Sequence, residues 1–337
     1  MPKNILYIGN KLQRHGRTAT TIDTLAPLLE SAGFKVHCAS HRVNKVSRFL
    51  DIITTVLRLK NWTHYVLIDT YSTQNFWYAI TVSRLCRLFK IKYIPILHGG
   101  NLPRRLLTHK QLVTRYLDNA HAVVSPSDFL KSAFAKALHT PIQVIKNNIE
   151  IAQYPFSERE VVQPNLLWVR SFAAVYNPMM ALDVLVVLLQ NYPNAQLTMV
   201  GPDKDGSMET CRQRALKDKL PVTFTGLLTK TEWIALSMTH GVFINTSNVD
   251  NLPVSIIEAM ALGLIVVSTQ VGGISFLVSH GINGLLVPAA NPDEMASAIN
   301  HILTDQTLAQ AVILNAFNTA AQHDWQVIKP QWVALLR

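Results

Sequence analysis

The sequence is poor in cysteine, in charge and in long apolar runs. It has three cysteines in 337 residues, and charged residues make up only 15% of it. Cys38, Cys86 and Cys211 are far apart and lack metal-ligand spacing, so we expect reduced, structural thiols of the kind found in cytoplasmic proteins. No apolar run reaches membrane-spanning length. The opening MPKNILYIGN leads directly into a predicted strand, so we expect no signal peptide.

Common nucleotide and metal motifs are missing as well. In the segment GNKLQRHGRTATTI, Gly9 and Gly16 would permit a tight loop whose backbone approaches a phosphate group. That segment lacks both the G-x-G-x-x-G spacing of dinucleotide-binding folds and the Lys-Ser/Thr of a P-loop. No set of His, Cys, Asp and Glu has metal-ligand spacing, and Asp203-Lys204-Asp205 matches D-x-D by letters only. The sequence therefore predicts neither a bound metal nor a resident cofactor.

The two halves of the chain differ in charge. Residues 1–150 contain 21 Lys and Arg against 7 Asp and Glu, a net charge of +14. Residues 151–337 contain 10 against 14, a net charge of −4. This asymmetry indicates that the halves meet different partners. For the basic half the candidates are an anionic membrane surface, nucleic acid or a phosphorylated acceptor.

Short apolar segments alternate with helical patterns in both halves. The predicted strands are 4–8, 35–39, 65–69, 93–97, 122–125, 142–145, 166–169, 196–200, 222–224, 242–245, 265–268 and 285–287. The predicted helices are 20–31, 46–60, 75–89, 128–136, 179–191, 208–216, 230–238, 254–261 and 293–303. This alternation predicts parallel sheets covered by helices, with ligands beyond the carboxyl ends of the strands. The segment NNIEIAQYPFSEREVVQPN interrupts it, so we predict two domains, 1–155 and 156–337.

The most informative segment is TSNVDNLPVSIIEAMALGLIVVSTQVGGISFLVSHGINGLLV, residues 246–287. It predicts a polar loop, a helix with Pro253 at its start, a buried strand, a glycine pair and a second strand. The helix N-terminus could bind phosphate through its free N–H groups. Asp250 falls in the loop, and Glu258 lies about one and a half turns inside the helix. The pair Gly272-Gly273 marks a close approach of backbone.

Taken in this order, the elements resemble the donor-binding signature of family 4 glycosyltransferases. That signature reads acid, small residue, any residue, Pro, four residues, Glu-Ala-Met-Ala, a strand and Val-Gly-Gly. The resemblance extends over nearly the whole chain and implies the GT-B fold, in which two Rossmann-like doubly wound domains face each other across a cleft. It implies an acceptor-binding N-terminal domain and a donor-binding C-terminal domain. One difference is Asp250, where the family usually has Glu. Because the aspartate side chain is one methylene shorter, this difference affects which sugar the site would prefer.

The resemblance also implies that the last helix, at about 325–336, returns to the N-terminal domain. Trp325, Ile328, Trp332 and Leu335 give this segment an apolar stripe at helical spacing, which fits docking.

The resemblance assigns roles to residues of the C-terminal half. Glu258 would accept hydrogen bonds from the ribose hydroxyls, and Arg170 would grip the diphosphate with its fork of donors. Each of these residues also has a purely structural alternative: a loop acid for Asp250, a helix-face acid for Glu258 and a solvated arginine at a strand end for Arg170. Asp250 and the backbone of Asn251, Leu252 and Pro253 would face the transferred sugar. The remaining residues expected in the donor site are Val254, Asn177 and Gly201, the last of them at the nucleotide. Ordinary turn chemistry explains Gly201 equally well.

A family lysine is missing, because Val175 stands where members have Lys five residues after the arginine. Helix N-termini and a basic residue of the other domain, for which Arg17 is a candidate, would then supply the charge. In the N-terminal half, His98 follows a buried strand in ILHGGNLPRR. The resemblance places it by the transferred sugar near the reaction centre, and a structural histidine is the alternative.

We therefore predict a retaining, metal-independent hexosyltransferase of polysaccharide biosynthesis that uses a UDP- or GDP-linked sugar. Its acceptor would be a hydroxyl of a lipid-linked or cell-surface glycan. We expect a cytoplasmic protein, peripheral on the inner face of the plasma membrane. Residues 46–62 form a basic amphipathic pattern, and a second basic cluster consists of Arg84, Arg87, Lys90 and Lys92. A core face with a solvated rim is the alternative to membrane contact.

Two other functions remain open on the sequence. One is a nucleotide-sugar epimerase of the same fold, which would turn over its substrate without an acceptor. The other is a non-enzymatic basic protein that binds membranes or nucleic acid, which would leave Arg170 and Glu258 unused. Nucleic acid is not expected, because the basic half lacks an aromatic-basic recognition motif.

Overall fold

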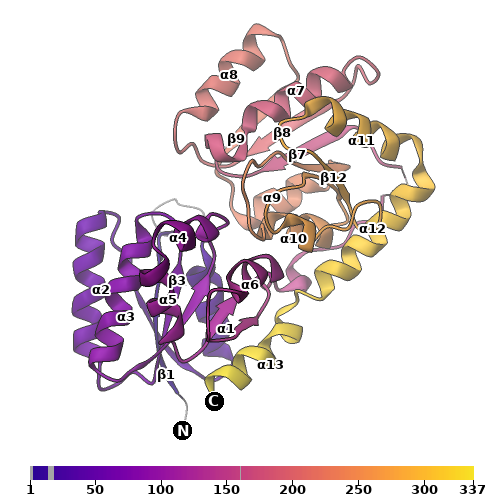
Figure 1. Cartoon of the computed structure of the whole chain (residues 1–337). Coiled ribbons are helices and arrows are strands. Elements are labelled where there is room, and N and C mark those ends of the chain that lie inside the picture. Colours follow the sequence, from indigo (N-terminus) through magenta and orange to yellow (C-terminus); the bar gives the residue numbers. More distant parts are fainter. Residues whose placement is uncertain (1–2, 14–18, 160) are drawn as a thin grey trace. The chain divides into compact units, whose positions relative to one another are not determined.

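The computed structural model describes residues 3–13, 19–159 and 161–337 and divides the chain into two compact units (Figure 1). The first unit comprises Met1–Asn148 together with Trp325–Arg337, and the second comprises Ile149–Asp324. Each contains one six-stranded sheet in which all paired strands are parallel. The prediction of two Rossmann-like domains is confirmed.

The first sheet has the strand order β2-β1-β3-β4-β5-β6. Its strands are β1 (Asn4–Ile8), β2 (Lys35–Ala39), β3 (Tyr65–Thr70), β4 (Lys92–Leu97), β5 (Val123–Ser125) and β6 (Ile142–Val144). The helices of this unit are α1 (Thr21–Ser31), α2 (Lys45–Leu59), α3 (Asn75–Leu88), α4 (Leu102–Thr108), α5 (Lys110–Asp118), α6 (Asp128–Ala135) and α13 (Trp325–Leu336). The direction in which strands are added reverses between β1 and β3.

Helices cover both faces of this sheet, as the alternation of strand side chains requires. Leu6 and Ile8 of β1 point to the face covered by α2 to α6. Ile5 and Tyr7 point to the other face, which α1 and α13 cover. The buried residues of α13 are Trp325, Ile328, Trp332 and Leu336. Leu336 thus takes the fully buried position that we had expected for Leu335, which is partly buried.

The second sheet has the order β12-β11-β10-β7-β8-β9, and its direction reverses between β7 and β10. Its strands are β7 (Asn165–Val169), β8 (Gln196–Val200), β9 (Val222–Gly226), β10 (Val242–Asn245), β11 (Ile265–Thr269) and β12 (Leu285–Val287). The helices are α7 (Pro178–Leu188), α8 (Ser207–Lys217), α9 (Lys230–Ser237), α10 (Val254–Ala261), α11 (Pro292–Thr304) and α12 (Gln306–Ala321). Helices α7, α8 and α11 pack on one face, α9 and α10 on the other, and α12 joins both cores.

The boundary between the units lies at 148/149, seven residues before the predicted 155/156. The connecting segment is anchored in the second unit. The Ile149 amide donates to the His323 carbonyl at 2.9 Å. The buried guanidinium of Arg159 donates to carbonyls of His240 and Leu262 at 2.8 and 2.9 Å. These bonds join the segment to the second unit, despite its proline- and charge-rich composition.

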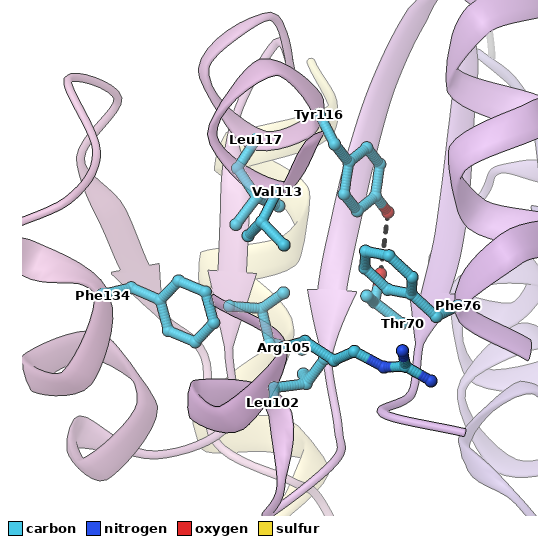
Figure 2. Close-up of a pocket in the computed structure, with 9 residues that line it drawn as sticks. Thr70, Phe76, Leu102, Arg105, Val113, Tyr116, Leu117 and Phe134 are labelled. Atoms are coloured by element: carbon cyan, nitrogen blue, oxygen red, sulfur yellow. Dashed lines mark hydrogen bonds between the residues drawn. The ribbon is translucent and has the colours of Figure 1, made fainter. Parts of the chain in front are cut away.

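Figure 2 shows a small cavity in the first unit, next to the carboxyl end of β3. Its volume is about 10 Å³, which is the lower limit for a single water molecule. The only side-chain hydrogen bond drawn across it joins the Thr70 and Tyr116 hydroxyls at 2.8 Å. The lining is mostly apolar and consists of Thr70, Phe76, Leu97, Leu102, Arg105, Val113, Tyr116, Leu117 and Phe134. It is a packing cavity and offers no room for a substrate.

Within the described part of the chain, no helix combines the length and the apolar character needed to cross a bilayer.

Candidate active site

In the second unit, charged side chains lie where the strand order reverses. Arg170 directly follows β7, and Asp250 lies in the loop after β10. These two strands are hydrogen-bonded neighbours in the sheet. In doubly wound sheets this is the point at which ligands bind, beyond the carboxyl ends of the strands.

Arg170 and Asp250 form an ion pair. Their side chains are 18% and 13% exposed, so the pair is reachable from solvent but largely desolvated. The guanidinium also lies over the ring of Tyr176, 4.6 Å from its centre. Burial lowers the pKa of Arg170, but the usual arginine value of about 12.5 or above keeps the group protonated at neutral pH. The site therefore holds a permanent cation with one flat face packed on an aromatic ring.

Two glycines support the backbone of this pair. Gly201 has φ +147°, and a Cβ there would lie 1.8 Å from the Arg170 carbonyl oxygen. Gly272 has φ +54°, and a Cβ there would lie 1.9 Å from the Asp250 carbonyl oxygen. No other residue type fits at either position without moving the backbone. The predicted close approach at Gly272 is thus to the Asp250 loop itself.

The Asp250 carboxylate is oriented by its own loop. The Asn251 amide donates to Oδ1 at 2.9 Å, and the Ser247 hydroxyl donates to Oδ2 at 3.3 Å. Asn251 and Leu252 are buried, whereas Val254 is 37% exposed. Pro253 is the N-cap residue and α10 starts at Val254.

The loop after Arg170 has a fixed shape but no second cation. Val175 is 39% exposed and belongs to a short 3₁₀ helix, Ala174–Tyr176. Asn177 then adopts a left-handed conformation, φ +46°, which asparagine tolerates better than most residues, and α7 follows. The Thr246 hydroxyl donates to the Tyr176 carbonyl at 2.9 Å. Position 175 therefore supplies no charge for a diphosphate.

The D-x-D letters have a local structural use. Asp205 Oδ2 accepts from the Ala174 amide at 2.8 Å, which ties the 170–177 loop to this turn. Asp203 Oδ1 accepts from the Gly206 amide at 3.0 Å, just before α8. Among the described residues, no group of three or more His, Cys, Asp and Glu side chains could hold a metal ion.

Glu258 lies inside α10 and is held by a residue that the sequence analysis did not single out. The Tyr154 hydroxyl donates to Glu258 Oε1 at 2.5 Å. The ammonium of Lys230, at the start of α9, lies 4.6 Å from the centre of the Tyr154 ring. Burial raises the pKa of Glu258, while the Tyr154 hydrogen bond and the Lys230 charge oppose that rise. Burial also raises the pKa of Tyr154, so its hydroxyl stays a donor.

The first unit has its own polar cluster at the reversal of strand order. Asp69 is the next-to-last residue of β3, and its Oδ1 lies 2.8 Å from His98 Nε2 and accepts from the Tyr7 hydroxyl at 2.9 Å. Gly9, directly after β1, is packed against the same carboxylate, because a Cβ there would lie 2.6 Å from Asp69 Oδ2. The sequence analysis named His98 and Gly9 but not their shared neighbour. An acid at the end of the apolar strand YVLID was the available signal.

The predicted residues thus fall into separate groups. Arg170 and Asp250 are paired, with Gly201 behind Arg170, and Glu258 is bound to Tyr154. His98 and Gly9 belong to the first unit. Gly16 and Arg17 lie outside the described residues.

Residues 163–305, all within the second unit, match the family model for glycosyl transferases group 1. The second unit is therefore similar to this family over most of its length. Two curated relatives illustrate it. A D-inositol 3-phosphate glycosyltransferase of Corynebacterium urealyticum is 26% identical over 48% of this chain and 39% of its own length. A glycogen synthase of Mycobacterium tuberculosis is 25% identical over 68% of this chain and 56% of its own length. The chain thus matches about two-fifths of the length of the first relative and just over half of the length of the second.

Solved structures match the whole chain. Sucrose-phosphate synthase from Thermosynechococcus elongatus has a TM-score of 0.80 at 19% identity, covering 99% of this chain and 98% of that one. Anabaena HepE in complex with UDP has a TM-score of 0.78 at 19% identity, covering 99% of both chains. These likenesses show the fold, and the GT-B prediction is confirmed. The signature at 246–287 fits family 4 within the group 1 glycosyltransferases.

Proposed function

We propose that this protein transfers a sugar from a UDP- or GDP-linked donor to an acceptor hydroxyl. The observation that carries the proposal is the Arg170–Asp250 pair at the reversal point of a group 1 glycosyltransferase sheet. A guanidinium there suits a diphosphate, which it can bind through two parallel N–H donors. HepE, of similar fold, has been solved with UDP and with UDP-glucose.

In the proposed reaction, the bond between the anomeric carbon and the diphosphate breaks, and the electron pair leaves with the diphosphate. The acceptor oxygen bonds to the anomeric carbon, and its proton passes to an oxygen of the departing diphosphate. Negative charge grows on the diphosphate, so a preorganised cation binds the transition state more strongly than the ground state. Tyr176 limits the movement of Arg170 by packing on its guanidinium. No protein nucleophile is assigned, and retention and metal independence rest on the family resemblance.

Asp250 has two parts in this scheme. Without donor it neutralises Arg170, which would otherwise be a partly buried and unpaired charge. When a diphosphate takes the guanidinium, Asp250 is released to face a hydroxyl of the transferred sugar. The nucleotide and the sugar are therefore recognised by two residues that bind each other in the empty site.

Glu258 supplies the ribose contact. Its Oε1 already accepts from Tyr154, which fixes the carboxylate and leaves Oε2 for ribose hydroxyls. The nearby Lys230 favours the charged form of Glu258, which is the better acceptor. Tyr154 and Lys230 therefore support the donor site although they lie outside the motif.

The acceptor is proposed to be lipid-linked, because the first unit presents a basic and apolar surface. Helix α2 buries Arg48, Ile52, Thr55 and Val56 on one side and exposes Val46, Leu50 and Leu57 on another, at 70%, 57% and 43%. These three side chains therefore lie outside the core of the first unit. Arg48 does not contribute to this surface, because its guanidinium donates to Asn10 Oδ1 and to the carbonyls of Arg42 and Val43.

A screen of nucleotide sugars with a lipid-linked glycan acceptor tests the function. We expect one UDP- or GDP-sugar to be consumed only when acceptor is present, with release of the nucleoside diphosphate and no effect of EDTA. Conversion of the nucleotide sugar without acceptor would favour an epimerase. Absence of turnover and of binding for every nucleotide sugar would contradict the proposal.

A further inference from the structure

The first unit has a second small cavity, which lies where the order of its strands reverses, between β1 and β3. The carboxyl ends of these strands and parts of α2 and α3 line it. Its volume is about 10 Å³, so it can hold one group of the size of a water molecule or a hydroxyl, but no whole sugar ring. Asn10, Tyr71, Asn75 and Tyr78 belong to the lining and are only partly buried, so the cavity borders the surface. Such a reversal point is where doubly wound sheets bind ligands.

The orientation of the Asn10 amide follows from its contact with Arg48. Nη1 of the guanidinium lies 2.8 Å from Oδ1 of Asn10. Arginine has N–H donors only, so the atom that faces it must be the amide oxygen and not the nitrogen. Nδ2 of Asn10 is left with two N–H donors and has no hydrogen-bond partner among the described residues. Asn10 therefore offers a donor to a ligand in the cavity.

Arg48 is itself fixed in place. Its Nε donates to the Arg42 carbonyl at 2.7 Å, and its Nη2 donates to the Val43 carbonyl at 2.8 Å. Only 6% of the residue is exposed, and burying a guanidinium costs free energy that a methionine at this position would not cost. Two nitrogens thus hold the guanidinium, and the third orients Asn10, although Arg48 is not part of the lining.

A second amide is that of Asn75, the first residue of α3. The side chain has no hydrogen-bond partner within the described part of the chain, so both its N–H donors and its oxygen are available. Tyr78 lies one turn further along the same helix face. Its hydroxyl donates to the Lys45 carbonyl at 3.0 Å, and its ring stacks on the Phe49 ring, 5.5 Å between centres. The wall beside Asn75 is therefore preformed.

The lining selects the chemistry of the ligand. Among the described residues that line the cavity there is no Lys or Arg, and the one charged residue is Asp69, so a phosphate or carboxylate group is a poor ligand. A hydroxyl both donates and accepts, as the two amides do. Because the cavity has the size of one water molecule, a hydroxyl inside it is within reach of both.

We propose that this cavity binds one non-reacting hydroxyl of the acceptor glycan through Asn10 Nδ2 and the Asn75 amide, with Arg48 as a positioning residue for Asn10. This rests on the proposed function, since it takes the ligand to be the acceptor. The cavity thus selects acceptors by the presence of that hydroxyl.

The first test needs no substrate. In a crystal structure of the ligand-free protein, we expect an ordered water within about 3.2 Å of Asn10 Nδ2 and of the Asn75 side chain, at the place of the hydroxyl. Oδ1 of Asn10 should face Arg48. An empty cavity, or an Asn10 amide turned away from Arg48, would overturn the proposal.

The second test is the acceptor KM, measured with octyl glycosides as acceptors. Asn10→Ala and Asn75→Ala should each raise it about 3- to 10-fold, the size expected for one neutral hydrogen bond, and leave donor KM unchanged. Since both amides bind the same hydroxyl, the effect of the double variant should differ from the product of the two single effects. Asn119→Ala is the matched control, because Asn119 caps the end of α5 through the Arg115 carbonyl. Wild-type acceptor KM in both folded variants would contradict the proposal.

Monodeoxy analogues of the accepted octyl glycoside separate recognition from a structural effect. In the wild type, one analogue that still has the reacting hydroxyl should have a higher KM than the parent glycoside. In the double variant Asn10→Ala, Asn75→Ala, this analogue and the parent should have the same KM. A structural disturbance would raise KM for all analogues alike, and that result would overturn the hydroxyl assignment.

The role of Arg48 is tested in two backgrounds. Arg48→Met should raise acceptor KM in the wild type but not in Asn10→Ala, where there is no amide left to orient. Arg48→Lys, which can still donate to Asn10, should raise it less, and it replaces Arg48→Met if that variant does not fold. An equal rise in both backgrounds would overturn the positioning role.

These tests separate the inference from the proposed function. If the wild type turns over no nucleotide sugar, the proposed function is overturned and the acceptor assignment with it. The position of the water in the crystal structure then still decides whether the cavity binds a hydroxyl-sized group. If the wild type is active and the asparagine variants keep its acceptor KM, only this inference is overturned.

Discussion

The two units place different chemistry at the same topological position. In both, polar side chains gather where the order of parallel strands reverses, between β1 and β3 in the first unit and between β7 and β10 in the second. The second unit has a guanidinium there, and the first has a carboxylate with a histidine. The fold therefore determines where polar side chains gather, and the residues after each strand determine what chemistry they offer.

The charges of the two units are also balanced in different ways. Arg170 is paired with Asp250, a neighbour that an anionic ligand could replace. Asp69 is held by Tyr7 and His98, which no anion would displace. We infer that the second unit rearranges when the donor binds, whereas the polar cluster of the first unit is preformed.

The largest expected effect comes from removing the cation of the second unit. Arg170→Ala should lower kcat/KM about 100- to 1,000-fold, because charge grows on the diphosphate as the sugar leaves. Arg170→Lys should retain part of the activity, because the lysine ammonium keeps the positive charge but lacks the two parallel N–H donors of the guanidinium. Melting temperatures serve as control, since the variant removes the cation that neutralises Asp250. Unchanged kcat/KM in a folded Arg170→Ala would place the diphosphate elsewhere.

Next is the ribose contact. Glu258→Ala should lower kcat/KM about 10- to 100-fold under limiting donor, and Glu258→Gln less, because the amide oxygen still accepts. Burial raises the pKa of Glu258, so donor binding in the wild type should weaken, as pH falls, earlier than for an ordinary carboxyl group. Glu258→Gln should not show this pH dependence. If Glu258→Ala only unfolds the protein, the carboxylate is structural.

A smaller effect on nucleotide binding should follow from removing the Asp250 charge that pairs with Arg170. Asp250→Asn should bind UDP or GDP about three- to tenfold more tightly than the wild type, since the anion no longer competes with the carboxylate. The same variant should transfer sugar more slowly, because the contact to the sugar is weakened. Calorimetric titrations with the bare nucleotide measure the first effect. Weaker nucleotide binding would show that Asp250 supports the phosphate site instead of competing with it.

The smallest effect concerns the surface of the first unit. The triple variant Val46→Ser, Leu50→Ser, Leu57→Ser should sediment less with vesicles containing anionic lipid, and moderate salt should release the wild type. Leu216→Ser is the matched control, because Leu216 is 82% exposed on α8 of the acidic second unit. Equal sedimentation of all three proteins would exclude α2 as a membrane contact.

Much of the fold could be predicted from the sequence, because short β-branched strands and amphipathic helices alternate with little interruption. Strand β10 and helix α10 have the predicted bounds. Helices α4 and α5 were missed, since they are short and meet at His109. Helix α12 was missed although Asp305 caps it and its buried residues follow helical spacing, because alanine gives that stripe little contrast.

The site was predictable only in part. The order of motif residues indicated Arg170, Asp250 and Glu258, but not that the first two pair across 80 positions of sequence. The partners Tyr154 of Glu258 and Tyr7 of Asp69 lie 104 and 62 positions away. Such contacts depend on tertiary packing and leave no local pattern in the sequence.

The central claim, that the diphosphate is bound mainly by the second unit through Arg170, is tested most directly by the thermal unfolding of the full chain with UDP or GDP. At about 100 times the dissociation constant, the nucleotide should add roughly 2.7 kcal/mol to the stability of the wild type. His98→Ala should be stabilised to the same extent, and Arg170→Ala should not be stabilised at that concentration. Stabilisation that persists in Arg170→Ala but is lost in His98→Ala, or that is absent from the wild type with both nucleotides, would contradict the account.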